Sequence, residues 1–433
     1  MEHQNQQNKS YALPIAMMFA LFFMISFVTG LQAPLGNITK NQFGLSEFAA
    51  QLGYFANFAA YAFMGIPAGV MLQRIGYKKT ALIAIIVGFI GVCITFFSGT
   101  IDSFVVYLIG AFVAGFSMCM LNAVVNPMLN TLGGGGKRGN QLLQFGGVIN
   151  SVGATIVPVL VGYLIGAAAN AGDDAVTVKI TDANPALFLA MGIFALAFIV
   201  LASVQIPEPQ QAVAVQSEAK KDSHSALSFR HFKLGALAIF LYVGIEVGIQ
   251  SIAFNFMKEG LKINASIVGS VVGTYWFLML IGRLVGGSLG SKFSSKGMLT
   301  FVSVLGIAFV LIAMVLPIEQ TVNMLVFKKD ISFGLAEVPI SIMFLILCGL
   351  CTSVMWGGIF NLATEGLGKY TAAASGIFMA MVCGGGILPA IQGAVVDVVG
   401  YMQSYWVIVI ALLYLLFYAL VGSKNVNTDI NVD

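Results

Sequence analysis

A series of long stretches without charged residues decides what this chain can fold into. A helix needs about 20 apolar residues to cross a bilayer, and twelve stretches reach that length, one of them interrupted once by Glu246. The strands of a membrane barrel would be about 10 residues long with alternating polarity, so a barrel is excluded. The stretches are 10–39, 48–73, 80–101, 103–136, 139–172, 183–207, 234–257, 263–282, 297–318, 338–364, 370–396 and 398–423.

The composition supports a membrane protein. Hydrophobic residues make up 58% of the chain and charged residues only 9%, whereas a soluble domain carries roughly 25% charged residues. Soluble enzymes and nucleic-acid-binding proteins are therefore excluded, and a net charge of +3 is too small to attract a nucleic acid. We expect an all-α polytopic membrane protein with twelve transmembrane helices.

The distribution of Lys and Arg predicts the orientation of these helices, because cytoplasmic loops carry an excess of both residues. If the N-terminus is cytoplasmic, fifteen of the 21 Lys and Arg residues fall on the inner side of the membrane and six on the outer side. We therefore expect a multi-pass protein of the cytoplasmic (inner) membrane with both termini in the cytoplasm. The six on the outer side are Lys40, Lys179, Lys258, Lys262, Lys328 and Lys329.

The two sets of six stretches carry matching sequence marks. Pro158 and Gly162 in the fifth stretch correspond to Pro389 and Gly393 in the eleventh, at a constant offset of 231 residues. Parallel six-helix repeats are the plan of an alternating-access carrier with its site between the halves. We predict an N-terminal bundle at 1–205, a cytoplasmic linker at 206–233 and a C-terminal bundle at 234–433.

Polar side chains within the stretches line helix faces. Asn122 and Asn126 follow each other at a spacing of four, as do Tyr242, Glu246 and Gln250, so each set shares one face. Amides bond to neighbouring hydroxyls and aromatic rings cover an apolar sugar face, which favours a neutral polyol; the alternative is that the asparagines join helices. The expected substrate-binding residues are Gln32, Asn122, Asn126, Asn150, Tyr242, Gln250, Trp356 and Asn361.

The residue types that are missing from the stretches also narrow the possible cargo and coupling mechanism. No Lys or Arg falls near the middle of any stretch, and Arg283 ends the eighth, where we expect it to anchor a loop. A carrier of organic anions would hold a central cation, so we expect neutral cargo. The histidines lie outside the stretches, which excludes a histidine proton relay. We expect no enzyme activity, no cofactor and no metal.

Glu246 is the one acidic residue near the middle of a stretch. Ionisable groups at that depth are costly and mark ion or substrate pathways. We therefore expect Glu246 to bind the coupling cation. The alternative is a permanently protonated carboxyl that bonds to a neighbouring helix.

These motifs resemble the major facilitator superfamily, whose loop signature is similar to Gly69…Arg74-Ile75-Gly76-Tyr77-Lys78-Lys79. Within it the chain resembles the fucose:proton symporter family, which includes glucose/galactose transporters. The residues that carry this resemblance include Asn126-Pro127, Asn150-Ser151, Phe240–Val247, Tyr275-Trp276 and Gly366–Lys369. The resemblance implies two pseudo-symmetric six-helix bundles and transport of a monosaccharide driven by protons or, in some relatives, sodium.

Two acidic positions of that family are not acidic here. The family reads Leu-Asn-Asp where this chain has Leu31-Gln32-Ala33, and it often has Glu where Asn122 stands. We expect a monomeric cation symporter, with protons as the coupling ion, for a hexose such as glucose, galactose, mannose or fucose. Sodium coupling, facilitated diffusion, and carriage or export of another neutral solute stay open.

Overall fold

Helices account for nearly all of the computed structural model, which describes residues 11–45, 49, 52–165, 179–204, 206, 224–328, 331–427 and 429–432. Eleven segments of this described chain are long and apolar enough to cross a membrane. A further helix, α6, has 30 residues. The predicted all-α membrane fold is confirmed.

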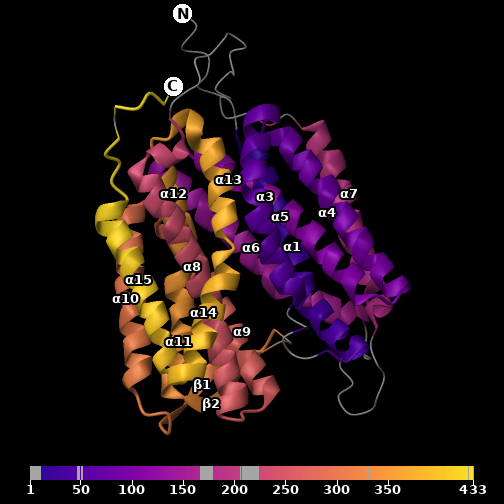
Figure 1. Cartoon of the computed structure of the whole chain (residues 1–433), viewed down its shortest axis with the longest axis vertical. Coiled ribbons are helices and arrows are strands. Elements are labelled where there is room, and N and C mark those ends of the chain that lie inside the picture. The colour runs from indigo at the N-terminus through magenta and orange to yellow at the C-terminus, as the bar shows by residue number, and fades with distance from the viewer. Residues whose placement is uncertain are drawn as a thin grey trace, which may run out of the picture.

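Six long helices form what we call the N-terminal half, and the helices from α8 onward form the C-terminal half. Figure 1 shows the two halves side by side, with the C-terminus at the end that we call the terminal side and two strands at the hairpin side. The N-terminal half contains α1 (Ala12–Phe43), α3 (Leu52–Ile75), α4 (Tyr77–Thr100), α5 (Phe104–Leu132), α6 (Gly136–Ile165) and α7 (Asn184–Ser203). The C-terminal half contains α8 (Arg230–Asn255), α9 (Ala265–Leu289), α10 (Ser295–Val315), α11 (Ile340–Thr352), α12 (Met355–Thr364), α13 (Thr371–Met381), α14 (Gly384–Val399) and α15 (Trp406–Phe417).

The predicted linker, 206–233, lies mostly outside the described residues. After this gap, a short 3-10 helix at Ala226–Ser228 leads into α8, which begins at Arg230. The predicted boundaries of the bundles at 205 and 234 therefore stay predictions.

Two predicted continuous helices are interrupted in the middle. The stretch 338–364 divides into α11 and α12, and the stretch 370–396 divides into α13 and α14. An interruption leaves backbone carbonyls without helical partners, and inside a membrane these must bond elsewhere. The carbonyl of Val354 accepts from the N–H of Gly358 at 3.2 Å and also from the side-chain amide of Gln144 at 3.0 Å, so the break between α11 and α12 is bonded to the other half.

The segment between α10 and α11 forms a hairpin that the sequence patterns did not predict. Strands β1 (Thr321–Phe327) and β2 (Phe333–Pro339) pair antiparallel. The ring of Phe327 stacks on Phe277 of α9 at 4.7 Å, and its backbone N–H donates to the hydroxyl of Thr274 at 2.8 Å. The hairpin is therefore held against α9 at the hairpin side of the C-terminal half (Figure 1).

The two halves approach most closely where α3 meets α13. A side chain at Gly65 would place its Cβ 2.3 Å from the backbone nitrogen of Ala380, and one at Gly376 would lie 2.6 Å from the carbonyl of Gly65. Only glycine permits backbones to approach to this distance. Small residues therefore allow direct helix contact between the halves.

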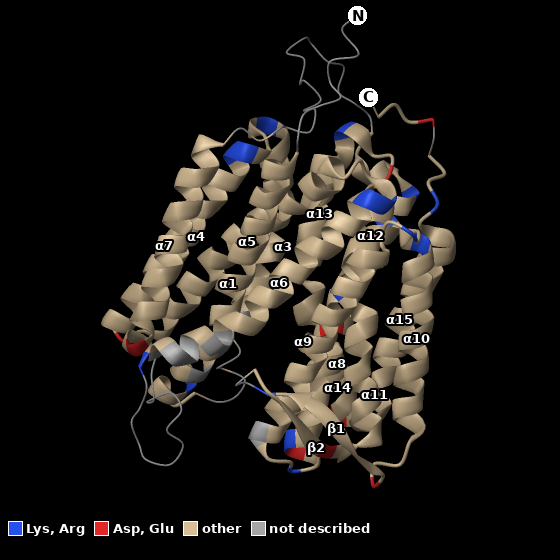
Figure 2. Cartoon of the chain, turned by 180° about the vertical axis from the view of Figure 1, so that it is seen from behind, with Lys and Arg blue, Asp and Glu red and all other residues tan. Residues whose placement is uncertain are grey.

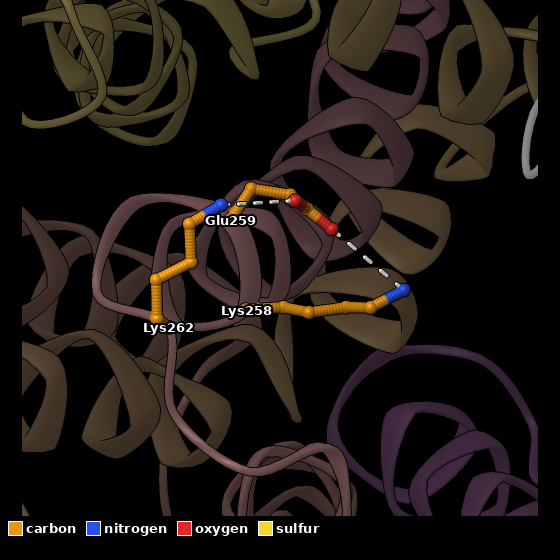
Figure 3. A network of polar contacts seen from close by, with 3 residues as sticks. All are labelled: Lys258, Glu259 and Lys262. Atoms are coloured by element: carbon orange, nitrogen blue, oxygen red, sulfur yellow. Dashed lines mark ion pairs between the residues drawn. The ribbon is translucent and has the colours of Figure 1, made fainter.

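The hairpin-side end of α8 carries a small charge network. There the helix continues into one π turn, Phe256–Gly260, and Glu259 lies 3.8 Å from Lys258 and 3.6 Å from Lys262 (Figure 3). These exposed pairs contribute little stability. The single carboxylate of Glu259 is shared by two of the lysines that the charge count assigns to the outer side.

Candidate functional site

A row of amides on α5 forms the N-terminal side of the site. The Asn126 amide donates to the backbone carbonyl of Asn122 at 2.8 Å, and the Asn122 amide donates to the hydroxyl of Tyr61 on α3 at 2.9 Å. The helix runs through Pro127 as one element. Asn122 is only partly buried, so part of its surface stays exposed inside the bundle.

This row is joined directly to the C-terminal half. The indole nitrogen of Trp356 on α12 donates to the side-chain oxygen of Asn126 at 2.9 Å. The Trp356 ring lies 6.2 Å from the ring of Tyr242 at an angle of 56°, and part of its surface stays exposed. An amide row from one half and two aromatic rings from the other therefore meet at one place.

Glu246 and Gln250 extend the site along α8, one and two turns from Tyr242. Both side chains keep part of their surface free in the middle of a transmembrane helix. The backbone carbonyl of Glu246 accepts from the Tyr275 hydroxyl at 3.2 Å, which fixes α8 against α9. Among the described helices, Glu246 is the one acidic residue that is remote from both helix ends.

The structure corrects the role predicted for Arg283. The expectation of a loop anchor is wrong, because α9 continues to Leu289 and the guanidinium points between the halves. It donates to the hydroxyl of Ser151 at 2.5 Å and to the carbonyl of Gly147 at 3.1 Å, both on α6. It also interacts electrostatically with Glu246. The site therefore holds a cation as well as an anion.

The remaining predicted residues occupy different places. Asn150 on α6 is partly exposed next to Ser151, whereas Gln32 on α1 is buried and its side-chain oxygen has no hydrogen-bond partner in the described structure. Asn361 is buried and donates to the Ser295 hydroxyl of α10 at 2.8 Å. That bond turns Asn361 into the C-terminal half, away from the Trp356–Asn126 contact.

Three residues of the site were not found from the sequence. Tyr61 has a single polar neighbour at helical spacing, Asn57, and Tyr275 has none, so no pattern identified either tyrosine as a member of a polar face. Gln144 is not among the predicted site residues, yet it is buried and bonds to the interrupted helix of the other half. A partner across the interface is invisible in the spacing of one helix.

The hydrogen bonds that the structure describes between the halves are confined to part of each helix. They involve the last third of α5 and the first half of α6, both of which lie toward the terminal side (Figure 1). The two halves are thus joined from the level of the site to the terminal side. Besides those already given, these bonds join Ser375 to Ala123 at 2.9 Å, Asn130 to Thr364 at 3.3 Å, Lys137 to Lys292 at 3.1 Å and Asn140 to the sulfur of Met298 at 3.7 Å.

The described residues offer no sign of a metal centre. They contain no group of three His, Cys, Asp or Glu side chains that could hold an ion. Cys348 and Cys351 are buried and free, so this Cys-x-x-Cys pair packs within α11. The chemistry of the site is that of amides, aromatic rings and one pair of opposite charges.

Comparison with known proteins gives a consistent picture. The family model described as Major Facilitator Superfamily matches residues 17–390. A glucose/galactose transporter of Brucella abortus is 30% identical over 98% of this chain and 97% of its own. The L-fucose-proton symporter of Escherichia coli is 25% identical over 92% and 90%. The crystal structure of FucP in the outward conformation superposes with a TM-score of 0.80 at 21% identity, covering 96% of this chain and all of that one.

Proposed function

Because this chain belongs to the major facilitator superfamily, it is a transporter and not an enzyme, and we propose that it carries a neutral hexose by alternating access. The observation that carries the proposal is the junction of Asn126 and Trp356. It brings an amide row and two aromatic rings from opposite halves to one place. Amides recognise sugar hydroxyls and rings cover the apolar face of a sugar.

The relatives support this class of substrate. The names of two of them specify glucose or galactose and fucose as cargo, and all three are neutral monosaccharides. We assign sugar contacts to Asn122, Asn126, Asn150, Gln250 and Trp356. Tyr242 and Gln32 support the same site, and Asn361 holds the C-terminal half together through Ser295.

We further propose that transport is coupled to protons through Glu246. Its carboxyl is the one acidic group in the middle of a described transmembrane helix, and moving one charge across 100 mV provides about 2.3 kcal/mol. The Escherichia coli relative is named as a proton symporter. A sodium requirement or simple facilitation would appear as a different gradient dependence in the uptake assay.

We propose that the terminal side faces the cytoplasm of a cell whose inner membrane holds the protein. Figure 2 shows Lys and Arg gathered at that side, whereas the hairpin side carries basic and acidic residues together. This matches the excess of basic residues on cytoplasmic loops. Because one chain supplies both halves of the carrier, we propose that the monomer transports.

Counterflow in proteoliposomes tests the substrate class without requiring any ion gradient. Vesicles loaded with one unlabelled hexose are diluted into trace amounts of the labelled sugar. A hexose carrier takes up the label transiently for its own substrate and for close stereoisomers. A panel containing glucose, galactose, mannose, fucose, a nucleoside and a dipeptide would overturn the proposal if only the non-sugar solutes exchanged.

A further inference from the structure

The chain that follows α15 lies at the terminal side of the C-terminal half (Figure 1). We call its described residues, 425–427 and 429–432, the strap. The side-chain oxygen of Asn427 accepts from the backbone N–H of Arg230 at 2.9 Å. Because α8 begins at Arg230, the strap is bonded to the start of that helix.

This bond caps α8 from a distant part of the chain. The first N–H groups of a helix have no carbonyl partner within it, and Phe229, which precedes α8, gives no side-chain cap. Asn427 and Arg230 are separated by 197 residues. The helix therefore keeps this cap only while the strap stays in place.

The strap also holds the loop between α12 and α13. The carbonyl of Val432 accepts from the backbone N–H of Lys369 at 2.9 Å, and a side chain at Gly368 would collide with the same carbonyl oxygen. In the first turn of α8, Nε2 of His231 lies 3.0 Å from the carbonyl of Glu365. The loop is therefore bound both by the strap and by the helix that the strap caps.

Helices α12 and α13 form a unit bounded by the two breaks within the membrane, at 353–354 and at 382–383. Hinge motions are absorbed by a few residues at the ends of such elements, so the unit can swing about the two breaks. Its side chains make three of the described hydrogen bonds to α5 in the other half. They belong to Trp356, Thr364 and Ser375.

We propose that the strap restrains the α12–α13 unit and thereby keeps the terminal side closed. With the strap in place, the loop stays on the start of α8 and the unit keeps its bonds to α5. When the strap leaves, the cap of α8 and the bond between Lys369 and Val432 are lost together. The unit then swings away from α5 and the terminal side opens. The strap acts whatever the cargo is, so its role goes beyond the proposed hexose transport.

Distances between spin labels test the proposal without substrate, after the five native cysteines are replaced. One pair, Arg138→Cys on α6 and Glu365→Cys on the loop, spans the two halves at exposed positions. A second pair, Ser291→Cys after α9 and Glu365→Cys, lies within the C-terminal half. Asn427→Ala removes the cap. We expect it to lengthen the 138–365 distances, to change the 291–365 distances, and to raise the open fraction about five-fold, the usual effect of a lost helix cap.

Two matched variants separate the lost cap from a general disturbance of the strap. Asn427→Asp keeps an oxygen that accepts from the N–H of Arg230, so it should retain the short distances. Asp429→Ala changes an exposed residue of the strap and should leave both distances unaltered. Gly368→Val forces the strap off the loop from the other side, so it should open the terminal side as Asn427→Ala does.

Three results would overturn the proposal. The first is an unchanged 138–365 distance in Asn427→Ala. The second is an Asn427→Asp variant as open as Asn427→Ala, because the cap would then not matter. The third is a longer 138–365 distance with an unchanged 291–365 distance, because the C-terminal half would then move as one rigid body. Failure of hexose counterflow would instead count against the proposed substrate, since the distance readout needs no sugar.

Discussion

The indole nitrogen of Trp356 donates a hydrogen bond of 2.9 Å to the side-chain oxygen of Asn126, and this bond joins helices from opposite halves of the chain. In a carrier that opens alternately to each side, such a bond must break and reform in every cycle. Both residues are among those that we assign to sugar contacts. The substrate and the closed interface therefore compete for the same polar atoms.

Substitutions at Trp356 separate its ring from its hydrogen bond. Trp356→Ala removes both, and we expect it to weaken hexose binding by about 1–3 kcal/mol, which is typical of a lost aromatic contact. Trp356→Phe keeps a ring but cannot donate, so its loss should stay near 1 kcal/mol. Titration of each purified variant with the transported hexose measures both losses of binding free energy. Equal losses would mean that the ring does not contact the sugar.

Tyr61 holds the amide of Asn122 at 2.9 Å. The same amide also donates to the carbonyl of Met118 at 3.0 Å, so we expect Tyr61→Phe to remove one of its two hydrogen bonds and to lower hexose affinity several-fold, by about 1 kcal/mol. A matched control is Tyr414→Phe, because that hydroxyl donates to Leu234 at 3.0 Å within the C-terminal half. If binding assays show that both variants lose the same affinity, the effect reflects general destabilisation and Tyr61 does not position the site.

Gly65 permits the contact between α3 and α13. Gly65→Leu would force a side chain into the backbone of Ala380, where a Cβ alone lies at 2.3 Å, so the terminal side could not close. We expect this variant to lose counterflow while remaining folded in the membrane. Gly192→Leu is the control, since a Cβ at Gly192 meets nothing within 4 Å. Wild-type exchange by Gly65→Leu would show that this contact is dispensable.

Glu246→Gln tests coupling separately from sugar movement. The amide keeps the size of the carboxyl but cannot carry a proton, so we expect concentrative uptake to disappear while counterflow remains measurable. Asp397→Asn, an exposed acid near the end of α14, should leave both activities intact. Loss of counterflow in Glu246→Gln would make Glu246 a binding or structural residue.

The fold was predictable because the hydrophobic pattern of a membrane protein is simple. Long apolar stretches have to become helices in lipid, and the described helices match them. The breaks at Ser353 and Val382 were not predictable, because both stretches are uninterrupted by charge or proline at those points. At the first break the carbonyl of Val354 accepts from the side-chain amide of Gln144 in the other half, and the sequence of a single helix carries no record of that contact. The second break is bonded within its own half, as by the N–H of Gly385 to the carbonyl of Val382 at 3.0 Å.

The site was predicted only in part, and Arg283 shows why. Dividing the chain at its charged residues places every Arg at the end of a stretch. Arg283 therefore looked like the end of a helix, although α9 continues past it to Leu289. Helical spacing correctly placed Asn122 and Asn126 on one face. It could not show that Asn361 turns toward Ser295, because the partner lies on another helix.

The central claim is that this transporter concentrates a hexose by proton symport, and gradient-driven uptake into proteoliposomes tests it most directly. Labelled sugars from the counterflow panel are offered with an inward proton gradient, with a sodium gradient and with neither. The account predicts accumulation of a hexose that needs the proton gradient and collapses with a protonophore. Accumulation driven by sodium alone, equilibration without accumulation, or no uptake of any hexose would contradict it.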